Sequence, residues 1–159
     1  MSRILVAYFS ASGVTGSVAH TLSEALNADL YEIAPAVPYT AADLDWRSAA
    51  SRSSLEMKDL SFRPEISDRP ADIASCDVLL LGFPIWWYIA PTIVNTFLEQ
   101  HHFSGKRIIL FATSGGSGFG KTLDGLKRSA PDALIEEGML QRGSQDMDAW
   151  KRWAMGLDL

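Results

Sequence analysis

The sequence predicts an α/β protein whose open, doubly wound parallel sheet carries helices on both faces. Three observations support this prediction. Short apolar runs alternate with Gly/Ser-rich loops and amphipathic segments about five times along the chain. The strongest runs are apolar throughout instead of alternating, which is typical of strands buried on both faces of a sheet. A length of 159 residues suits one substantial core, so we expect residues 1–159 to form a single domain.

The first half of the chain begins with a strand, a loop and a helix. Residues 4–9 (ILVAYF) form the first predicted strand, and a Gly/Ser/Thr-rich loop follows it. A helix is predicted over residues 14–26, because the apolar residues of this segment lie on one helical stripe. Residues 30–33 form a second, short strand.

The second half repeats this pattern. Residues 77–83 (DVLLLGF) predict a third strand at the centre of the sheet, and Ile93 and Phe97 mark the helix after it. Residues 107–112 (RIILFA) predict a fourth strand.

The last part of the chain completes the sheet. Leu123 and Leu126 mark the helix after the fourth strand, and residues 133–140 hold a fifth strand. A closing helix is predicted over residues 145–155, with Ser144 as its N-cap and its Met and Trp residues spaced to face the core.

The connection from residue 33 to residue 77 is too long for a single crossover, and we assign an insertion to about residues 38–66. Thr40 and Asp43 resemble a capping box, which predicts an extra helix that ends near Lys58. The insertion is either a structural addition or a flap over a binding site, and the sequence leaves both interpretations open.

Composition excludes several classes of function. With 14 basic and 19 acidic residues the formal net charge is −5, which argues against a nucleic-acid or anionic-membrane surface. The single cysteine, Cys76, excludes an internal disulfide framework and a CxxC metal site, and it fits a reducing cytoplasm. No apolar stretch has the length of a membrane span, and no side chains show metal-ligand spacing, so we expect a cytoplasmic protein without a metal.

The loop after the first strand, residues 10–15 (SASGVT), has three hydroxyl groups and a glycine but no basic residue. Hydroxyl groups and free backbone N–H groups at the start of a helix can bind a phosphate, and the helix dipole helps them. No acidic residue occurs in the following helix before Glu24, which leaves room for an external anion. An ordinary capped turn has a similar composition, so this loop alone does not establish an anion site.

The loops after the third and fourth strands are also unusual. Residues 82–88 (GFPIWWY) place large aromatic side chains beyond a buried strand, where they can stack on a flat ligand or can simply seal the end of the sheet. Residues 113–122 (TSGGSGFGKT) include four glycines, which allow the backbone to approach a ligand closely. In an open parallel sheet, ligands bind beyond the carboxyl ends of the strands, so we expect the three loops to form one site.

Residues 115–122 also fit G-x-x-x-x-G-K-[ST], the phosphate-binding loop of nucleotide hydrolases. Such a loop normally works with an acidic residue at the end of a neighbouring strand. The three clearest strands end in Phe9, Phe83 and Ala112, while Asp77 lies at the wrong end of its strand. A nucleotide-binding protein therefore remains a remote alternative.

Taken together, FSASGVT, GFPIWW and TSGGSGFG resemble the flavodoxin family along nearly the whole chain, apart from the insertion. The resemblance implies five parallel strands in the order 2-1-3-4-5 and an FMN cofactor. In that family the first loop holds the FMN phosphate, and the two later loops hold the isoalloxazine ring. The residues that the resemblance assigns to the phosphate are Ser10, Ser12, Gly13, Val14 and Thr15. Those that it assigns to the ring are Pro84, Ile85, Trp86, Trp87, Thr113, Ser114, Gly115, Gly116, Ser117 and Gly118.

The resemblance implies electron transfer with redox partner proteins, a reductase and an acceptor, and chemistry that takes place on the flavin instead of on catalytic side chains. One departure concerns residues 84–88, which contain no glycine, whereas many one-electron flavodoxins have one near the flavin N5. An alternative is an NAD(P)H-dependent quinone or nitro reductase, in which Tyr39, Trp46 and Arg47 of the insertion could cover a substrate pocket. A binding module that has lost its cofactor is a further alternative.

Overall fold

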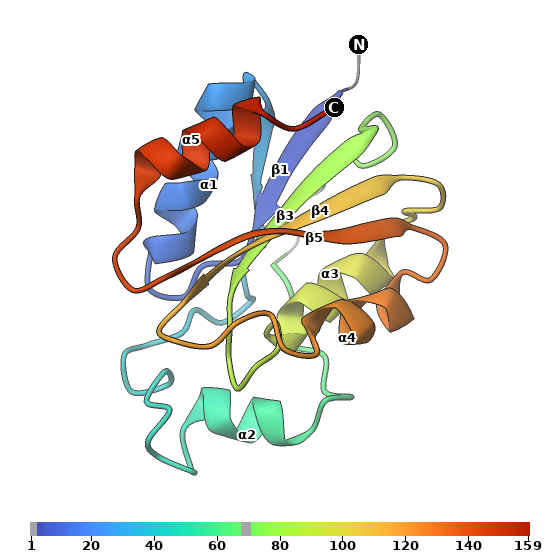
Figure 1. Cartoon of the computed structure of the whole chain (residues 1–159). Helices are drawn as coiled ribbons and strands as arrows, with labels where there is room; N and C mark the ends of the chain where they lie inside the picture. The colour runs from blue at the N-terminus through green and yellow to red at the C-terminus, as the bar shows by residue number, and fades with distance from the viewer. Residues whose placement is uncertain (1–2, 68–70) are drawn as a thin grey trace.

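The computed structural model describes residues 3–67 and 71–159 and shows a five-stranded parallel sheet between two layers of helices (Figure 1). The strands pair in the order β2-β1-β3-β4-β5, which confirms the predicted fold class. Their bounds are β1 Ile4–Tyr8, β2 Asp29–Glu32, β3 Val78–Pro84, β4 Arg107–Ser114 and β5 Leu134–Arg142. The helices are α1 Val14–Leu26, α2 Arg52–Lys58, α3 Thr92–Gln100, α4 Thr122–Ser129 and α5 Met147–Met155.

The central strands are buried on both faces because their side chains alternate between two hydrophobic clusters. Leu79 and Leu81 of β3 point into the cluster under α3 and α4, whereas Leu80 points into the cluster under α1 and α5. Trp150 of α5 is fully buried against Phe111 of β4, with 6.0 Å between ring centroids. This two-sided burial explains why the third and fourth predicted strands are apolar throughout.

Two helix starts differ from the predictions. Thr40 and Asp43 form a reciprocal pair of side chain–backbone hydrogen bonds of 2.9 and 3.2 Å, but turns follow, and α2 begins at Arg52 with Ser51 as its cap. The cap of α5 is Asp146, whose carboxylate accepts a hydrogen bond from the Ala149 N–H at 3.1 Å, so the predicted Ser144 cap is wrong. In both cases another residue with a capping side chain, Ser51 or Asp146, lies closer to the buried part of the helix and caps it.

The edge strand β5 contains an irregularity opposite the middle of β4. Leu110 pairs with Glu137 and Phe111 pairs with Met139, so Gly138 is the extra residue of a β-bulge. A β-carbon at Gly138 would lie 2.5 Å from both the Leu110 carbonyl oxygen and the Trp153 ring. Glycine is therefore required where α5 packs on the sheet.

A substitution at Gly82 tests how tightly side chains pack against the central strands of the sheet. An alanine β-carbon there would lie 2.1 to 2.7 Å from the buried Phe111 ring, which cannot move away because Trp150 packs behind it. We expect Gly82→Ala to lower the free energy of unfolding by about 2–3 kcal/mol in urea denaturation. The control Gly125→Ala places its methyl group in open space on α4 and should leave stability unchanged or raise it by about 0.5–1 kcal/mol. Equal stability of the two variants would contradict this account.

Candidate functional site

The carboxyl ends of β1, β3 and β4 meet at one edge of the sheet, because the three strands are neighbours and parallel. The loops that follow them therefore lie together, at the lower side of Figure 1. The insertion between β2 and β3, with α2, lies at the same edge. This arrangement collects the three loops singled out in the sequence and adds a fourth segment to them.

The loop between β1 and α1 presents hydroxyl groups and backbone at the start of a long helix. Ser12 and Gly13 are exposed, and Gly13 has a left-handed φ of 95° as the N-cap of α1. The Ser10 hydroxyl accepts a hydrogen bond from the Gly13 N–H at 3.1 Å, which closes the loop. The first turn of α1 has neither an acidic residue nor a side-chain cap, so its positive dipole end faces outward without a protein anion.

A buried pair of hydroxyl groups ties this loop to the end of β4. Thr15 and Thr113 are almost fully buried, and their Oγ1 atoms lie 2.8 Å apart. One hydroxyl donates to the other, so one hydrogen of the pair remains for another acceptor. The two residues thus fix the distance between the first and third loops.

The loop between β3 and α3 contains a tight turn with an unusual backbone. Trp86 and Ile89 exchange backbone hydrogen bonds of 2.9 and 3.2 Å around the two residues between them. Those residues, Trp87 and Tyr88, have positive φ values of 49° and 66°. Such a turn normally prefers Asn and Gly, because a side chain in the left-handed region costs energy. Both side chains remain exposed, at 44% and 65%, so packing around them does not explain the conformation.

The end of the glycine-rich loop holds this turn in place. The Tyr88 carbonyl accepts a hydrogen bond from the Lys121 N–H at 3.1 Å. Gly120 has a φ of 55°, and a β-carbon there would lie 2.2 Å from the Tyr88 oxygen, so glycine is required at this position. The Thr122 N–H donates to the Phe119 carbonyl. At the end of residues 115–122, which fit the phosphate-binding loop of nucleotide hydrolases, the Lys121 and Thr122 N–H groups are therefore bonded to protein carbonyls and are not free for a nucleotide phosphate.

The first part of the glycine-rich loop is braced from both sides. The Ser114 hydroxyl accepts a hydrogen bond from the Gly116 N–H at 3.1 Å and lies 3.3 Å from the Ser117 hydroxyl. Arg142, at the end of β5, donates from Nε to the Gly116 carbonyl at 3.1 Å. This arginine brings a positive charge to the loop, and no sequence motif indicated it.

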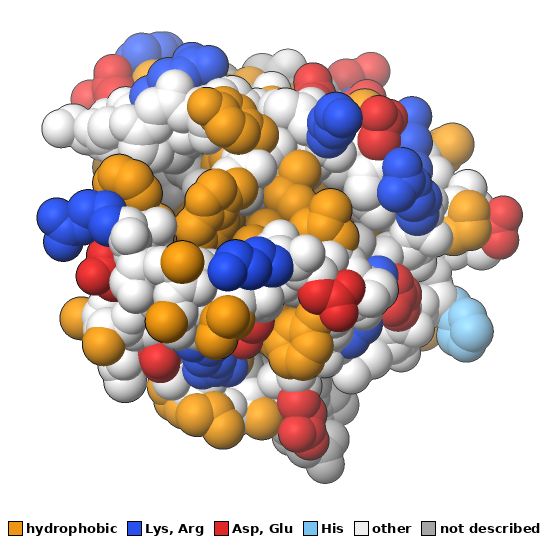
Figure 2. Space-filling model, turned by 90° about the horizontal axis from the view of Figure 1, so that it is seen from below, with side chains coloured by type: hydrophobic (Ala, Val, Ile, Leu, Met, Phe, Trp, Pro, Cys, Tyr) orange, Lys and Arg blue, Asp and Glu red, His pale blue; other side chains and the backbone are white. Residues whose placement is uncertain are grey.

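A cavity of about 400 Å³ lies between these loops and the insertion. Its lining residues are Leu44, Trp46, Ser53, Ile85, Trp86, Trp87, Tyr88, Gly115, Gly116 and Ser117. Figure 2, which views the molecule from below, shows hydrophobic side chains gathered over the middle of this face. Trp46 is 71% exposed at the rim. The hydroxyl oxygen of Ser53 is buried and has no hydrogen-bond partner among the residues described.

The insertion is anchored next to this cavity by aromatic and ionic contacts. The Tyr39 ring meets the Trp86 ring edge-on at 5.6 Å and the Phe9 ring at 5.7 Å. The Tyr39 hydroxyl donates to the Glu56 carboxylate, which also accepts from Arg52 Nε at 2.9 Å. The Arg52 guanidinium lies 3.8 Å from the centre of the Tyr39 ring. Because Leu44, Trp46 and Ser53 of the insertion line the cavity, the geometry favours a flap over a site among the two interpretations of the insertion.

The structure brings some of the sequence-predicted residues together and separates others. Six of the ten ring residues line the cavity, namely Ile85, Trp86, Trp87, Gly115, Gly116 and Ser117. Pro84, Thr113 and Ser114 lie behind them at the strand ends, and Gly118 faces Arg142. None of the five residues predicted for the phosphate lines this cavity, and their loop is tied to the end of β4 by the Thr15–Thr113 hydrogen bond. Arg47, expected over a substrate pocket, lies outside the cavity and pairs with Asp45 at 3.3 Å.

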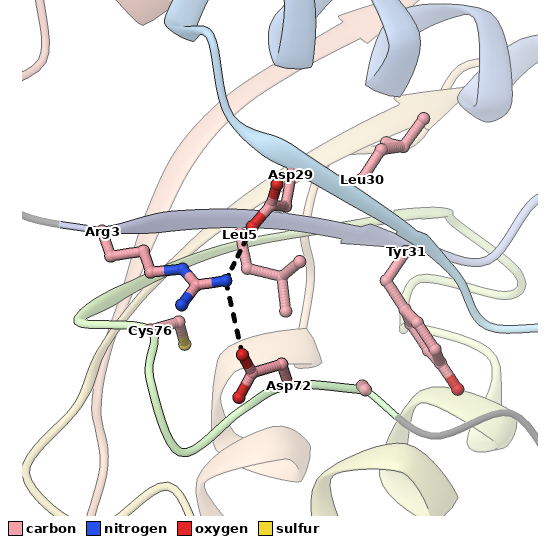
Figure 3. A pocket seen from close by; sticks show the side chains of 8 residues that line it. Arg3, Leu5, Asp29, Leu30, Tyr31, Asp72 and Cys76 are labelled. Atoms are coloured by element: carbon pink, nitrogen blue, oxygen red, sulfur yellow. Dashed lines mark hydrogen bonds and ion pairs between the residues drawn. The ribbon is translucent and has the colours of Figure 1, made fainter.

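A second cavity, of about 310 Å³, lies at the opposite edge of the sheet (Figure 3). Arg3 points into it and pairs with Asp29 at 3.1 Å and with Asp72 at 3.3 Å, so its charge is already balanced. Cys76 is almost fully buried there, and burial raises the pKa of its thiol, which is typical of an unreactive cysteine.

Across residues 3–67 and 71–159 no group of His, Cys, Asp and Glu side chains could hold a metal ion. Within the same ranges no helix combines the length and apolar character that crossing a membrane requires.

Comparisons with known proteins agree with the architecture. A family model described as Flavodoxin matches residues 3–157. A candidate flavoprotein from Bacteroides eggerthii is 49% identical, with a TM-score of 0.87 and 96% of each chain covered. A second, from Bacteroides uniformis, is 44% identical, with a TM-score of 0.89 and coverage of 97% of this chain and 98% of that one.

A flavoprotein from Lactobacillus acidophilus, solved in complex with FMN, shares the fold at 20% identity, with a TM-score of 0.69 and coverage of 94% and 99%. No curated protein matches the chain significantly.

Tyr39 provides a pH test of the insertion's anchor. Burial raises the pKa of its phenol far above the ordinary value of 10.0, and the hydrogen bond to Glu56 raises it further. Below pH 10 both the folded and the unfolded chain keep this proton. Above it the unfolded chain loses the proton first, so the free energy of unfolding should fall with a slope of up to about 1.4 kcal/mol per pH unit. In Tyr39→Phe that slope should be smaller, measured by urea denaturation between pH 9 and 11. The same slope in both proteins would contradict the anchor.

Proposed function

The chain belongs to the flavodoxin family, and from this premise we propose that it binds FMN at the carboxyl edge of its sheet and acts in electron transfer. The observation that carries the proposal is the 400 Å³ cavity between two aromatic and glycine-rich loops. A cavity lined by Trp side chains suits the tricyclic ring of FMN, because stacking of the ring on Trp adds binding energy to the burial of its apolar surface.

The residues present fit both ends of FMN. For the ring, the cavity offers indole side chains, glycine backbone and the unpartnered Ser53 hydroxyl. For the phosphate, the exposed Ser12 and Gly13 stand at the uncapped start of α1, which favours an anion without a basic side chain. The Thr15–Thr113 pair holds these two parts at a fixed separation.

FMN, when bound, supplies the electron chemistry, and the protein orients it and controls its surroundings. Trp86 is fixed by Tyr39 and Phe9, and the Trp87–Tyr88 turn is fixed by Lys121, so this wall of the cavity is preorganised. Leu44 and Ser53 line the cavity on the side of the insertion. The exposed Trp46, Trp87 and Tyr88 form an apolar rim on which a redox partner protein can dock.

Comparison with relatives supports the cofactor. The two Bacteroides proteins are candidate flavoproteins at more than 40% identity, and the more distant Lactobacillus protein with the same fold was solved with FMN. The match to the phosphate-binding loop of nucleotide hydrolases supports ATP less well, because residues 115–117 line the proposed ring cavity while Lys121 and Thr122 line another.

FMN binding is tested by comparing FMN with riboflavin, which lacks the phosphate. Ser12→Asp places a negative charge in the first loop, so it should weaken FMN binding at least about tenfold in a fluorescence titration. Riboflavin binding should change little. The control Ser104→Asp adds the same charge in the exposed loop before β4, at the other edge of the sheet, and should affect neither ligand. Failure of FMN to bind, or uptake of ATP with magnesium instead, would overturn the proposal.

Electron transfer is tested by adding NAD(P)H to the FMN-loaded protein without another enzyme. A carrier that depends on a reductase should keep its oxidised absorption spectrum for minutes. Rapid loss of the flavin absorbance would instead favour the NAD(P)H-dependent reductase, and a protein without any flavin band would favour the empty binding module.

A further inference from the structure

A separate cavity of about 300 Å³ lies between the starts of α3 and α4, on the other side of the Trp86–Ile89 turn from the proposed flavin site. Ile89 lines this cavity, whereas Trp86, Trp87 and Tyr88 line the flavin cavity. The turn therefore forms a wall between two neighbouring sites. None of the flavin-binding residues predicted from the sequence lines the second cavity.

Two buried threonines that line this cavity have hydroxyl groups without partners among the residues described. Thr92 is the first residue of α3 and Thr122 the first residue of α4, and they are 3% and 1% exposed. Neither Oγ1 atom has a hydrogen-bond partner within the described part of the chain, and both residues line the cavity. Leaving a buried hydroxyl unpaired costs about 1–3 kcal/mol, so two of them at one cavity point to a missing polar ligand.

Two helix starts meet at the same place and contribute their dipoles there, while the Lys121 and Thr122 N–H groups of α4 already donate to the Tyr88 and Phe119 carbonyls. Neither α3 nor α4 has a side-chain cap, and the N-cap residues are Pro91 and Lys121. Their positive dipole ends meet at the cavity because the two helices pack side by side. Asn95 keeps the helices in register, since its amide donates to the Gly125 carbonyl at 3.2 Å and to the Ser129 hydroxyl at 2.8 Å.

The charges around the cavity favour an anion in a chain whose net charge is −5. Arg63, Lys121 and Arg128 line it, together with one acidic residue, Asp124. Arg63 already pairs with Glu99 at 2.9 Å. Lys121 and Arg128 form no ion pair with any residue that the structure describes, so two cations remain for a ligand.

We propose that this cavity binds the phosphate group of a small phosphomonoester. Hydroxyl groups, helix N-termini and a lysine are the donors that phosphate sites share, and the arrangement joins all three. Leu60, Ile89 and Leu126 supply apolar walls, and the volume exceeds that of a phosphate alone, so an organic part of the ligand fits beside it. The site gives Lys121 and the Thr122 hydroxyl a role that the flavin site leaves unassigned. The proposal does not rest on flavin binding.

The test is a calorimetric and ³¹P NMR titration of FMN-saturated protein with inorganic phosphate, because bound FMN occupies the first loop. Lys121→Gln and Thr122→Val should each weaken phosphate binding about tenfold. Lys121→Gln keeps the backbone bond to Tyr88, and Thr122→Val removes a hydroxyl that has no partner, so both variants should fold. The matched control Lys127→Gln removes an exposed charge of α4 that does not line the cavity, and it should bind phosphate like the wild type.

Two nucleotides distinguish the sources of the phosphate. If the ligand is the 2′-phosphate of a dinucleotide, NADPH should bind more tightly than NADH, and Lys121→Gln should remove the difference. If the ligand is a smaller phosphomonoester, the two dinucleotides should bind equally while inorganic phosphate still binds. Absence of binding by phosphate and by NADPH, or binding that neither variant weakens, would overturn the proposal.

The same variants separate this proposal from the flavin proposal. If FMN does not bind at all, phosphate is titrated into the protein as purified. If Lys121→Gln then weakens phosphate binding and Ser12→Asp does not, the second cavity is supported, although the proposed function has failed. If only Ser12→Asp weakens phosphate binding, the phosphate binds at the loop between β1 and α1, and the proposal of a second site is overturned.

Discussion

The parallel pairing of β1, β3 and β4 fixes the positions of the three loops that were predicted to form the site. Their register brings the carboxyl ends of the three strands to one edge of the sheet, and a loop follows each strand there. Leu79, Leu80 and Leu81 are buried alternately in two clusters, so a one-residue slip of β3 would be costly and its register is fixed. The Gly- and Ser-rich loops thus extend from strands whose register is fixed by packing on both faces.

The loops at this edge are also connected to one another, so they form one unit. Thr15 is bonded to Thr113, Tyr88 is bonded to Lys121, and Trp86 is packed against Tyr39 of the insertion. Each contact joins segments far apart in the sequence. A substitution in one loop therefore also affects the positions of the neighbouring loops. Residues outside the cavity lining contribute in this way to the shape of the cavity.

Much of the fold and part of the site could be predicted from the sequence, because the signals involved are local. The helix over residues 14–26 was predicted to the residue, since a Gly/Ser loop precedes a regular apolar stripe. The roles of Ser53 and Arg142 were not predictable, because only tertiary contacts bring an insertion serine and a β5 arginine to these loops. The left-handed Trp87 carries no glycine or asparagine signal either. Local rules also failed at residue 40, where the capping hydrogen bonds form but no helix follows.

The bulge at Gly138 has a consequence for the behaviour of the protein at high concentration. Exposed sheet edges invite strands from other molecules, and β5 is one of the two edges of this sheet. Its middle carries Glu136 and Glu137, both exposed, directly before the bulge, while the other edge strand, β2, has only four residues and begins with Asp29. Charge, irregular pairing and shortness together protect both edges of the sheet against pairing with strands of other molecules.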